Sequence, residues 1–449
     1  MPDRFDAVIL GMGPGGEVVA TRLLEGGLKI AVVERELIGG ECGYWACIPS
    51  KTLLRPPEAQ SEARRAAGTS TPSINWEAVA AYRDFMIRYL DDAAQVKGYE
   101  EQGAAVYKGA GKVVGPGTVV VGGGATINAD HIVVATGSDP AMPSIEGLSQ
   151  GTVWTNREAT TLKEIPERVV FLGGGPVGVE LGQALARFGS RVTIVQSADR
   201  LIDREDPMVG RLIEEALREE GVEVITGKRA VRVRRDGDNT VLELDDGAAL
   251  SANVLVVATG RSPRVQDLGL ESVGVQPGKK GIPIDDRCAA AEGVWAIGDV
   301  TGVMPFTHVA KYQARVVAAN ILGRPSVAQY RGIPRVVFTD PEIAAVGLTE
   351  EQAREAGHDV AATTLDLPES IARPWLYEQE PRGTLGLVAD RKERVLLGAW
   401  AVAPLAGEWI HQPALAVRAQ LSIDVLLDTA AQFPTYSEGF LNALEQLEL

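Results

Sequence analysis

The chain of 449 residues is 45% hydrophobic and 23% charged, an ordinary composition for a globular protein of two to four domains. Its net charge of −16 argues against nucleic acid or an anionic membrane as the main partner, because both need basic patches. No stretch approaches the roughly 18–20 apolar residues of a membrane span, the N-terminus shows no signal-peptide pattern, and three cysteines are too few for a disulfide framework. We therefore expect a cytoplasmic protein that binds neither nucleic acid nor membrane.

A phosphate-binding turn is predicted near the N-terminus. Residues 6–10, DAVIL, predict a buried parallel strand, and the glycine turn GMGPGG leads into the helical stretch EVVATRLLEGG. Gly11, Gly13 and Gly16 fit G-x-G-x-x-G: the first allows the tight turn, the second lets backbone approach a pyrophosphate, and the third permits close packing of helix on strand. Glu34 ends the next strand, where a carboxylate accepts hydrogen bonds from ribose. A glycine-rich loop without function is the plainer alternative, which Glu34 weakens.

The middle of the chain repeats this arrangement. Residues 51–97 look mainly helical and residues 104–135 look like strands, but from residue 168 the sequence RVVFLGGGPVGVELGQALARFGSRVTIVQ again predicts strand, glycine turn, helix and strand. The glycines of this second turn are Gly173, Gly175 and Gly178. This internal duplication predicts an α/β protein with two Rossmann-like dinucleotide-binding domains.

The strand end of the second copy differs from the first. Gln196 takes the place that Glu34 has in the first copy, and Arg200 follows shortly after. A carboxylate there favours NAD and repels a 2′-phosphate, so its loss beside an arginine tilts the prediction towards NADP. A solvated surface cation is an equally good interpretation of Arg200, and the choice between NADP and NAD stays open.

Two further segments complete the chain. The block EGVWAIGDVTG at 292–302 precedes a helical stretch, and from about residue 331 a strand-and-helix region without glycine turns ends in FPTYSEGFLNALEQLEL. We place domain boundaries near residues 147, 265 and 331.

Residues 39–51, GGECGYWACIPSK, contain two of the three cysteines, Cys42 and Cys47. A zinc site is disfavoured because a structural zinc needs four ligands, Cys288 is distant in sequence, and the four histidines are scattered, so we predict no metal. Two inert buried thiols are a second alternative. The third is a redox pair, since a cysteine at a helix start has its thiolate stabilised by the helix dipole and can cycle between dithiol and disulfide.

Together these motifs resemble the class I pyridine nucleotide–disulfide oxidoreductases, the flavoproteins that include dihydrolipoamide dehydrogenase, glutathione reductase and mercuric reductase. The resemblance covers nearly the whole chain, because the first glycine turn, the cysteine segment, both ATG stretches, AIGD and VVFTDPEIAAVGLTE occur in the family's order. It implies an enzyme with FAD and NADP or NAD, a homodimer, and a C-terminal α+β dimerisation domain. The implied domains are FAD-binding at 1–147 and 266–331, NAD(P)-binding at 148–265, and dimerisation at 332–449.

The resemblance also implies roles for single residues. Cys47 would lie against the flavin as the thiolate, and Cys42 would be the interchange thiol that meets the substrate. Lys51 would approach flavin N5 and pair with Glu180, since a buried lysine needs a counter-charge. The residues expected around the two cofactors are Gly11, Gly13, Gly16, Glu34, Gly40, Lys51, Gly111, Thr136, Gly137, Gly173, Gly175, Gly178, Gln196, Arg200, Gly260, Gly298 and Asp299.

The C-terminal segment departs from the family pattern. Disulfide-reducing members end in H-P-T-x-S-E, whereas this chain has FPTYSE, so Phe433 replaces the proton-shuttling histidine while Glu438 remains. Phenylalanine accepts no proton, and general acid–base help is typically worth about 10²–10⁴ in rate. Mercuric reductases also lack this histidine but usually carry a C-terminal cysteine pair, which is absent here. Ketopropyl-coenzyme M oxidoreductase/carboxylase has the phenylalanine but replaces the glutamate.

Bulky residues between the cysteines are a second departure. Tyr44 and Trp45 stand where the family usually has small or amide residues. Core packing is the plainer interpretation; a wall that shapes access to Cys42, or a proton-donating hydroxyl on Tyr44 or Tyr436, is the functional one.

We therefore predict an FAD-dependent NAD(P)H oxidoreductase that passes electrons through a Cys42–Cys47 disulfide to a disulfide, a dithiol or a related small acceptor. The alternative is a mercuric-reductase-like reductase of a metal, quinone or thioether that needs no histidine. The sequence does not name the physiological substrate.

Overall fold

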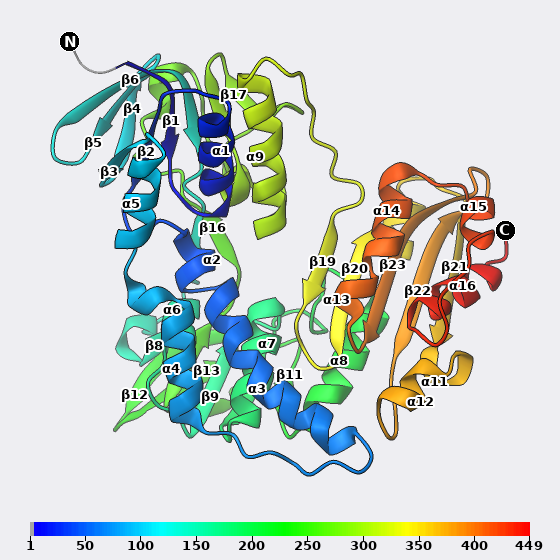
Figure 1. Cartoon of the computed structure of the whole chain (residues 1–449). Helices are drawn as coiled ribbons and strands as arrows, with labels where there is room; N and C mark the ends of the chain where they lie inside the picture. Colours follow the sequence, from blue (N-terminus) through cyan, green and yellow to red (C-terminus); the bar gives the residue numbers. More distant parts are fainter. Residues whose placement is uncertain (1–3) are drawn as a thin grey trace. The chain divides into compact units, whose positions relative to one another are not determined.

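The computed structural model describes residues 4–449, which form two compact units (Figure 1). The first unit comprises residues up to 50, 81–141 and 260–329, and the second comprises 51–80, 142–259 and 330–449. The division falls within two helices, α3 (Cys47–Arg65) and α4 (Trp76–Met86). The domain boundaries expected near 147, 265 and 331 stay a prediction.

An eight-stranded sheet forms the first unit. Its main path runs β17-β18-β6-β1-β2-β3, and the hairpin β4–β5 joins through β6. The bounds are β1 Arg4–Leu10, β2 Ile30–Glu34, β3 Ala105–Lys108, β4 Gly111–Gly115, β5 Thr118–Val121, β6 Ala125–Val134, β17 Ala289–Ala291 and β18 Val294–Ala296. The central strand β1 is parallel to both β2 and β6, and Ala7 pairs with Ile30 and with His131.

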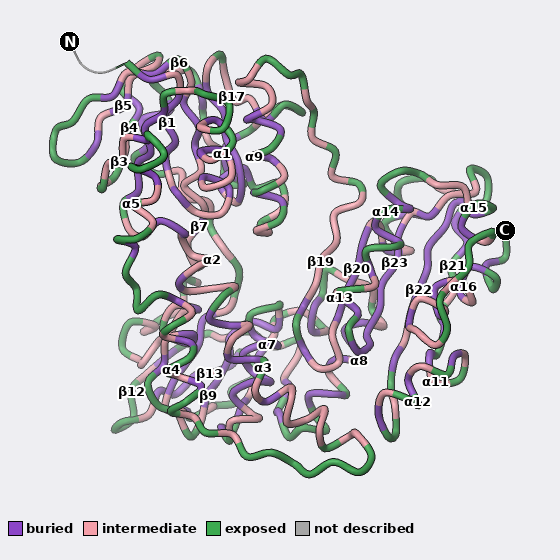
Figure 2. The backbone as a smooth tube through the Cα atoms, viewed as in Figure 1, coloured by how far each residue is buried: buried purple, intermediate pink, exposed green. Residues whose placement is uncertain are grey.

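Apolar side chains on both faces of this sheet explain the uninterrupted run DAVIL, since a parallel strand is covered on both sides. Ala7 and Ile9 pack into the core formed with helices α1 (Pro14–Glu25) and α9 (Thr307–Ile321), while Val8 and Leu10 pack towards the β4–β5 side. The purple, buried segments of Figure 2 follow these strands. The remaining elements are α2 Gly40–Tyr44, η1 Arg88–Leu90, α5 Ala93–Glu101, η3 Leu270–Val273, η4 Gly298–Thr301, and the paired strands β7 Ser138–Pro140 and β16 Arg261–Pro263.

The second unit contains the repeated arrangement. A parallel sheet of order β11-β10-β9-β15-β8 carries helix α7 (Pro176–Arg187), and an antiparallel sheet of order β12-β13-β14 is inserted between β11 and β15. The bounds are β8 Val153–Trp154, β9 Arg168–Leu172, β10 Arg191–Val195, β11 Glu223–Ile225, β15 Val254–Val257, β12 Ala230–Asp236, β13 Asn239–Leu244 and β14 Ala249–Ala252, with η2 Leu148–Gln150, α6 Asn156–Thr160 and α8 Pro207–Glu219. The predicted duplication is therefore confirmed.

The C-terminal part of the second unit is a five-stranded antiparallel sheet of order β19-β20-β23-β22-β21 with helices packed on it. The strands are β19 Pro334–Val337, β20 Glu342–Gly347, β21 Val360–Asp366, β22 Thr384–Asp390 and β23 Val395–Ala403. The helices are α10 Glu350–Glu355, α11 Leu367–Ser370, α12 Arg373–Tyr377, α13 Ala406–Trp409, α14 His411–Ala419, α15 Ile423–Leu427 and α16 Ser437–Glu445. Within residues 4–449, none of the helices combines the length and apolar character that crossing a bilayer requires.

Candidate active site

The first glycine turn has one glycine that packing does not require. A Cβ on Gly11, whose φ is +98°, would lie 2.4 Å from the carbonyl oxygen of Ala135, and a Cβ on Gly16 would lie 2.1 Å from that of Gly11. A Cβ on Gly13 would have no neighbour within 4 Å. The open space at Gly13, at the start of α1, suits a phosphate group that must approach backbone N–H groups.

Glu34 closes the same turn from the end of β2. Its side chain is 7% exposed, and its two carboxylate oxygens accept hydrogen bonds from the backbone N–H groups of Met12 and Glu36, both at 2.7 Å. These bonds compensate for burying a charge and fix the carboxylate next to the glycine turn. The position is the one that a ribose-binding acid needs.

The second turn copies this geometry. A Cβ on Gly173 would lie 2.4 Å from the Ala258 carbonyl oxygen, a Cβ on Gly178 would lie 2.0 Å from that of Gly173, and a Cβ on Gly175 would have no neighbour within 4 Å. Gln196 Oε1 accepts the backbone N–H of Gly174 at 3.0 Å. The residues present at both turns thus fit a dinucleotide.

Arg200 is held by its own loop. Its Nη2 donates to the carbonyl oxygen of Asp203 at 2.8 Å, its Nη1 lies 3.4 Å from Asp199, and its buried Nε has no partner within residues 4–449. The guanidinium is therefore engaged in local contacts. Its expected part in binding NADP stays a prediction.

The other residues expected around the cofactors have varied surroundings. Thr136 donates to the carbonyl oxygen of Arg264 at 2.8 Å, and Asp299 accepts a hydrogen bond from Ser138 at 2.5 Å. Gly137 and Gly260 have positive φ and open space at the Cβ position, whereas Gly298 lies against Ala310. Gly111 has a packing reason of its own, because a Cβ there would lie 2.9 Å from Leu10.

The two cysteines lie close together in the first unit; both are half-buried, and no disulfide joins them. Cys42 belongs to α2 and Cys47 is the first residue of the 19-residue helix α3. Cys47 Sγ is 3.3 Å from Thr307 Oγ1. A hydrogen bond to Cys47, followed by burial, raises the pKa of the Cys42 thiol. A helix N-terminus and a hydroxyl favour negative charge on Cys47.

Tyr44, between the cysteines, is a core residue. Its side chain is fully buried, its hydroxyl donates to the carbonyl oxygen of Ile38 at 3.1 Å, and burial raises its pKa. Its ring centroid lies 5.7 Å from that of Trp45. A hydroxyl that is inaccessible and already bonded does not reach an acceptor, so the structure favours the packing interpretation of Tyr44.

Lys51 and Glu180 form a salt bridge in the second unit. Lys51 Nζ lies 2.7 Å from Glu180 Oε2, and the other carboxylate oxygen accepts the backbone N–H of Phe338 at 2.9 Å. The Lys51 ammonium also lies 4.7 Å from the centre of the Phe338 ring. Glu180 is 5% exposed, so the lysine supplies the counter-charge that a buried carboxylate requires. The pair that the resemblance implies is present; its role beside a flavin stays a prediction.

The C-terminal segment holds two buried polar atoms without partners. Phe433 is 74% exposed, so it fills no core position. Within residues 4–449, Glu438 Oε2 and the Tyr436 hydroxyl are buried with no hydrogen-bond partner. Tyr436 is 4% exposed, stacks on Trp409 with ring centroids 6.0 Å apart, and has its pKa raised by burial. It is therefore a poor proton donor for an external molecule.

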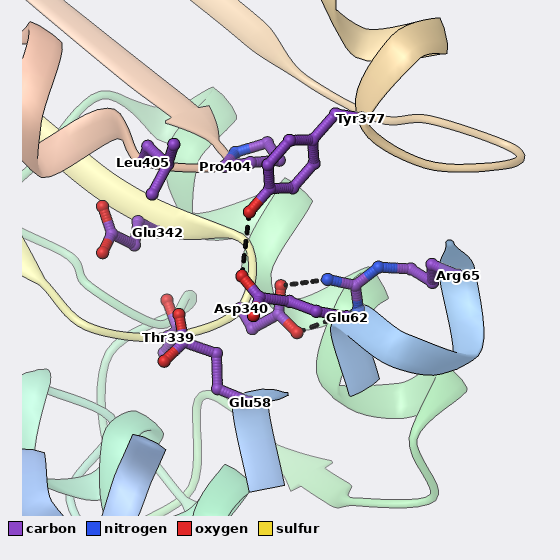
Figure 3. Close-up of a pocket in the computed structure, with 9 residues that line it drawn as sticks. All are labelled: Glu58, Glu62, Arg65, Thr339, Asp340, Glu342, Tyr377, Pro404 and Leu405. Carbon is purple, nitrogen blue, oxygen red and sulfur yellow. Dashed lines mark hydrogen bonds and ion pairs between the residues drawn. The ribbon is translucent and has the colours of Figure 1, made fainter. Parts of the chain in front are cut away.

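A cluster of ion pairs that the sequence did not reveal lies in the second unit (Figure 3). Arg65 reaches both carboxylate oxygens of Asp340 at 2.9 Å, and Tyr377 donates to Glu62 at 2.8 Å. Glu342 lines the same pocket, and burial raises its pKa to about 7. Across residues 4–449 no group of three or more acidic, histidine or cysteine side chains could hold a metal ion. Its members come from α3, the loop between β19 and β20, β20 itself and α12, and no local sequence motif predicts it.

Two glycine turns that each join a strand of a largely parallel array to a helix, with a cysteine pair in the same unit as the first turn, are the arrangement expected of an oxidoreductase that binds two dinucleotides. The comparisons with known proteins agree. Residues 5–314 match the model described as pyridine nucleotide-disulphide oxidoreductase, and residues 333–444 match the dimerisation domain of the same family.

Relatives share sequence over almost the full length. A mercuric reductase of Staphylococcus aureus is 34% identical over 97% of this chain and 81% of its own, and a dihydrolipoyl dehydrogenase of Thermus scotoductus is 35% identical over 99% and 97%. The structure of RclA from Escherichia coli, described as an HOCl-induced flavoprotein disulfide reductase, has a TM-score of 0.87 at 28% identity over 98% of this chain and 99% of its own.

The chain therefore belongs to the pyridine nucleotide-disulphide oxidoreductase family. It is an NAD(P)H-dependent flavoprotein disulfide oxidoreductase that uses FAD, and its dimerisation domain implies a homodimer. The predicted fold class and enzyme class are confirmed.

Proposed function

We propose that Cys42 and Cys47 are the redox pair of this enzyme, with Cys47 as the thiolate and Cys42 as the thiol that meets a small-molecule acceptor. When bound, FAD takes electrons from NAD(P)H and passes them to the disulfide of this pair. The environment of Cys47 carries the proposal: it begins α3, lies 3.3 Å from the Thr307 hydroxyl, and is hydrogen-bonded to Cys42. The helix N-terminus, the hydroxyl group and the hydrogen bond each stabilise a negative charge on the Cys47 sulfur.

The remaining predicted residues complete the proposal. Lys51, held by Glu180 at 2.7 Å, places a positive charge for the reduced flavin, and Glu34 holds the ADP ribose of FAD at the first turn. Gln196 replaces the acid at the second turn, which favours NADPH over NADH. The cytoplasm, where thiols are kept reduced, is the compartment we propose.

An anaerobic titration with NADPH and NADH tests the redox pair. We expect a long-wavelength charge-transfer band after two electrons per subunit, lost in Cys47→Ala and kept in the control Cys288→Ala, because Cys288 is fully buried. A wild-type enzyme that shows no such band would contradict the dithiol mechanism. A band that survives Cys47→Ala would reverse the roles of the two cysteines.

A reductase that needs no histidine is the second candidate function. Phe433 favours it, because this exposed side chain stands where disulfide reductases keep their proton shuttle, and relatives named mercuric reductase reach 34–36% identity. The orphaned Glu438 Oε2 favours ordinary disulfide exchange instead, because the glutamate of an acid–base pair is retained.

Turnover on a small disulfide, a quinone and Hg²⁺ separates these candidates. Restoring the pair with Phe433→His should speed disulfide reduction by about 10²-fold, whereas Phe433→Leu should not. If the wild type, Phe433→His and Phe433→Leu reduce the small disulfide at equal rates, Phe433 does not limit that reaction.

A further inference from the structure

The N-terminal turns of three helices converge beside Cys42. A Cβ on Gly40 of α2 would lie 2.7 Å from Gly13 Cα at the start of α1, and a Cβ on Gly15 of α1 would lie 3.3 Å from the Ala310 side chain of α9. Figure 1 shows α1 and α9 side by side in the first unit. The first turns of α1 and α9 therefore flank the short helix that carries Cys42.

Lys311 lies one turn after Thr307 on the same face of α9. Residues four apart share one face of a helix, and Thr307, four residues before Lys311, has its hydroxyl 3.3 Å from Cys47 Sγ. The positive charge of Lys311 acts on Cys42, whose pKa it lowers against the larger opposing effects of the Cys47 hydrogen bond and burial. It also acts on Glu17 of α1, whose pKa burial raises.

The other charged groups around the pair are already engaged. Glu41, next to Cys42, lies 3.2 Å from Arg264 and 3.8 Å from Arg261, so its negative charge is offset. The Arg88 guanidinium lies 5.7 Å from the centre of the Tyr44 ring and acts on Glu17. The charged and titratable side chains that interact with Cys42, with Lys311 or with their immediate neighbours are thus Cys47, Glu17, Glu41, Arg88, Arg261 and Arg264, with His308 in the first turn of α9 stacked on Phe306.

We propose that Lys311 stabilises the thiolate of Cys42 during electron transfer to the acceptor, and so replaces part of what a histidine at position 433 would supply. The inference rests on the proposed role of Cys42 as the thiol that meets the acceptor. Lys311 acts through Cys42 by its charge and moves no proton.

The step can be written for an acceptor disulfide. Cys42 gives its proton to the Cys47 thiolate along their hydrogen bond and attacks one acceptor sulfur. A Cys42–sulfur bond forms and the acceptor S–S bond breaks. The leaving thiolate takes the electron pair of that bond and a proton from solvent. Cys47 then loses its proton to solvent and attacks Cys42, which closes the enzyme disulfide and releases the second thiolate. Two electrons leave the enzyme, and the Cys42 anion is the species next to the Lys311 charge.

Alkylation of a single accessible thiol tests this inference without turnover. In FAD-loaded enzyme carrying Cys47→Ser, Cys42 is the thiol that iodoacetamide reaches, because Cys288 is fully buried. We expect Lys311→Met to raise the midpoint of the pH–rate profile by about 0.5 pH unit, or about threefold less thiolate at a given pH. Lys311→Arg should restore the midpoint, and 1 M salt should shrink the shift because the lysine is exposed.

Arg315→Gln provides the matched control. Arg315 is an exposed cation one turn further along α9, so its removal should leave the midpoint unchanged. An unchanged midpoint in Lys311→Met, an equal shift in Arg315→Gln, or a failure of Lys311→Arg to restore the midpoint would overturn the inference. The enzyme that carries Lys311→Met alone should keep the charge-transfer band. If the wild-type enzyme itself shows no such band, the proposed redox pair is refuted instead.

Discussion

The turns at Gly11–Gly16 and Gly173–Gly178 repeat one backbone geometry with different chemistry at the strand end. In both turns a Cβ on the first glycine would lie 2.4 Å from a carbonyl oxygen, a Cβ on the third would lie 2.1 or 2.0 Å from one, and a Cβ on the middle glycine would meet nothing. In both, a side-chain oxygen at the end of the next strand accepts a hydrogen bond from a backbone N–H of the turn. Glu34 accepts from Met12 at 2.7 Å, and Gln196 accepts from Gly174 at 3.0 Å.

What differs between the copies is charge. The amide of Gln196 satisfies the backbone of its turn as the carboxylate of Glu34 does, but only the carboxylate repels an additional phosphate. The glycines of both turns fit a dinucleotide, and we expect the strand-end side chain of the second turn to distinguish NADPH from NADH. Substitutions made in parallel at the two turns can separate these contributions.

The largest effect is expected at the third glycine of each turn. Gly16→Val places a branched side chain against the Gly11 carbonyl oxygen, which backbone movement alone can relieve, and should cost about 3 kcal/mol or more of stability together with FAD binding. Gly178→Val should cause a similar loss of stability at the second turn, together with loss of NAD(P)H binding. NAD(P)H should then no longer reduce the enzyme, while FAD stays bound. Flavin absorbance of the purified proteins and thermal unfolding measure both. Loss of FAD in Gly178→Val would show that the copies are not independent.

The glycine turns were predictable because G-x-G-x-x-G between a strand and a helix is a short and specific pattern. Only part of its physical cause is local: the third glycine is required by the carbonyl oxygen of the first, whereas the first is required by the carbonyl oxygen of Ala135 or Ala258, which follow distant strands. The ion pair of Lys51 and Glu180 was available only through resemblance, since 129 positions separate the two residues.

The surroundings of the cysteines were only partly predictable. Thr307 comes from a helix 260 positions after Cys47, and the sequence contains no motif that connects the two. Arg200 shows the opposite case, because a plausible phosphate ligand turns out to be bonded to the Asp203 carbonyl of its own loop. Tertiary packing brings Thr307 to Cys47, and the conformation of a loop engages Arg200; the strand–turn–helix pattern contains neither.

A smaller effect is expected at the two middle glycines. Gly13 and Gly175 have φ of −71° and −80°, values that alanine adopts, and an added Cβ meets no protein atom. Gly13→Ala should therefore leave the free energy of unfolding without cofactor within about 1 kcal/mol of wild type but weaken FAD about tenfold or more, by occupying the space of the pyrophosphate. Gly175→Ala should weaken NAD(P)H alone. Cofactor dissociation constants beside apoprotein unfolding curves measure the difference, and a stability loss without a change in affinity would contradict a phosphate at these positions.

The smallest effect is expected from giving the second turn the charge of the first. Gln196→Glu keeps the oxygen that accepts the Gly174 N–H and adds a negative charge where a 2′-phosphate would lie. The ratio of kcat/KM for NADPH over NADH should therefore fall about tenfold, a change of about 1.4 kcal/mol in transition-state binding. Arg200→Met is the matched control: because its guanidinium is held by Asp203 and Asp199, its loss should change the same ratio less than the Gln196 substitution does. If Arg200→Met lowers the ratio more, the arginine leaves its loop to bind the phosphate, and cofactor choice depends on a movement of that loop rather than on the strand-end side chain.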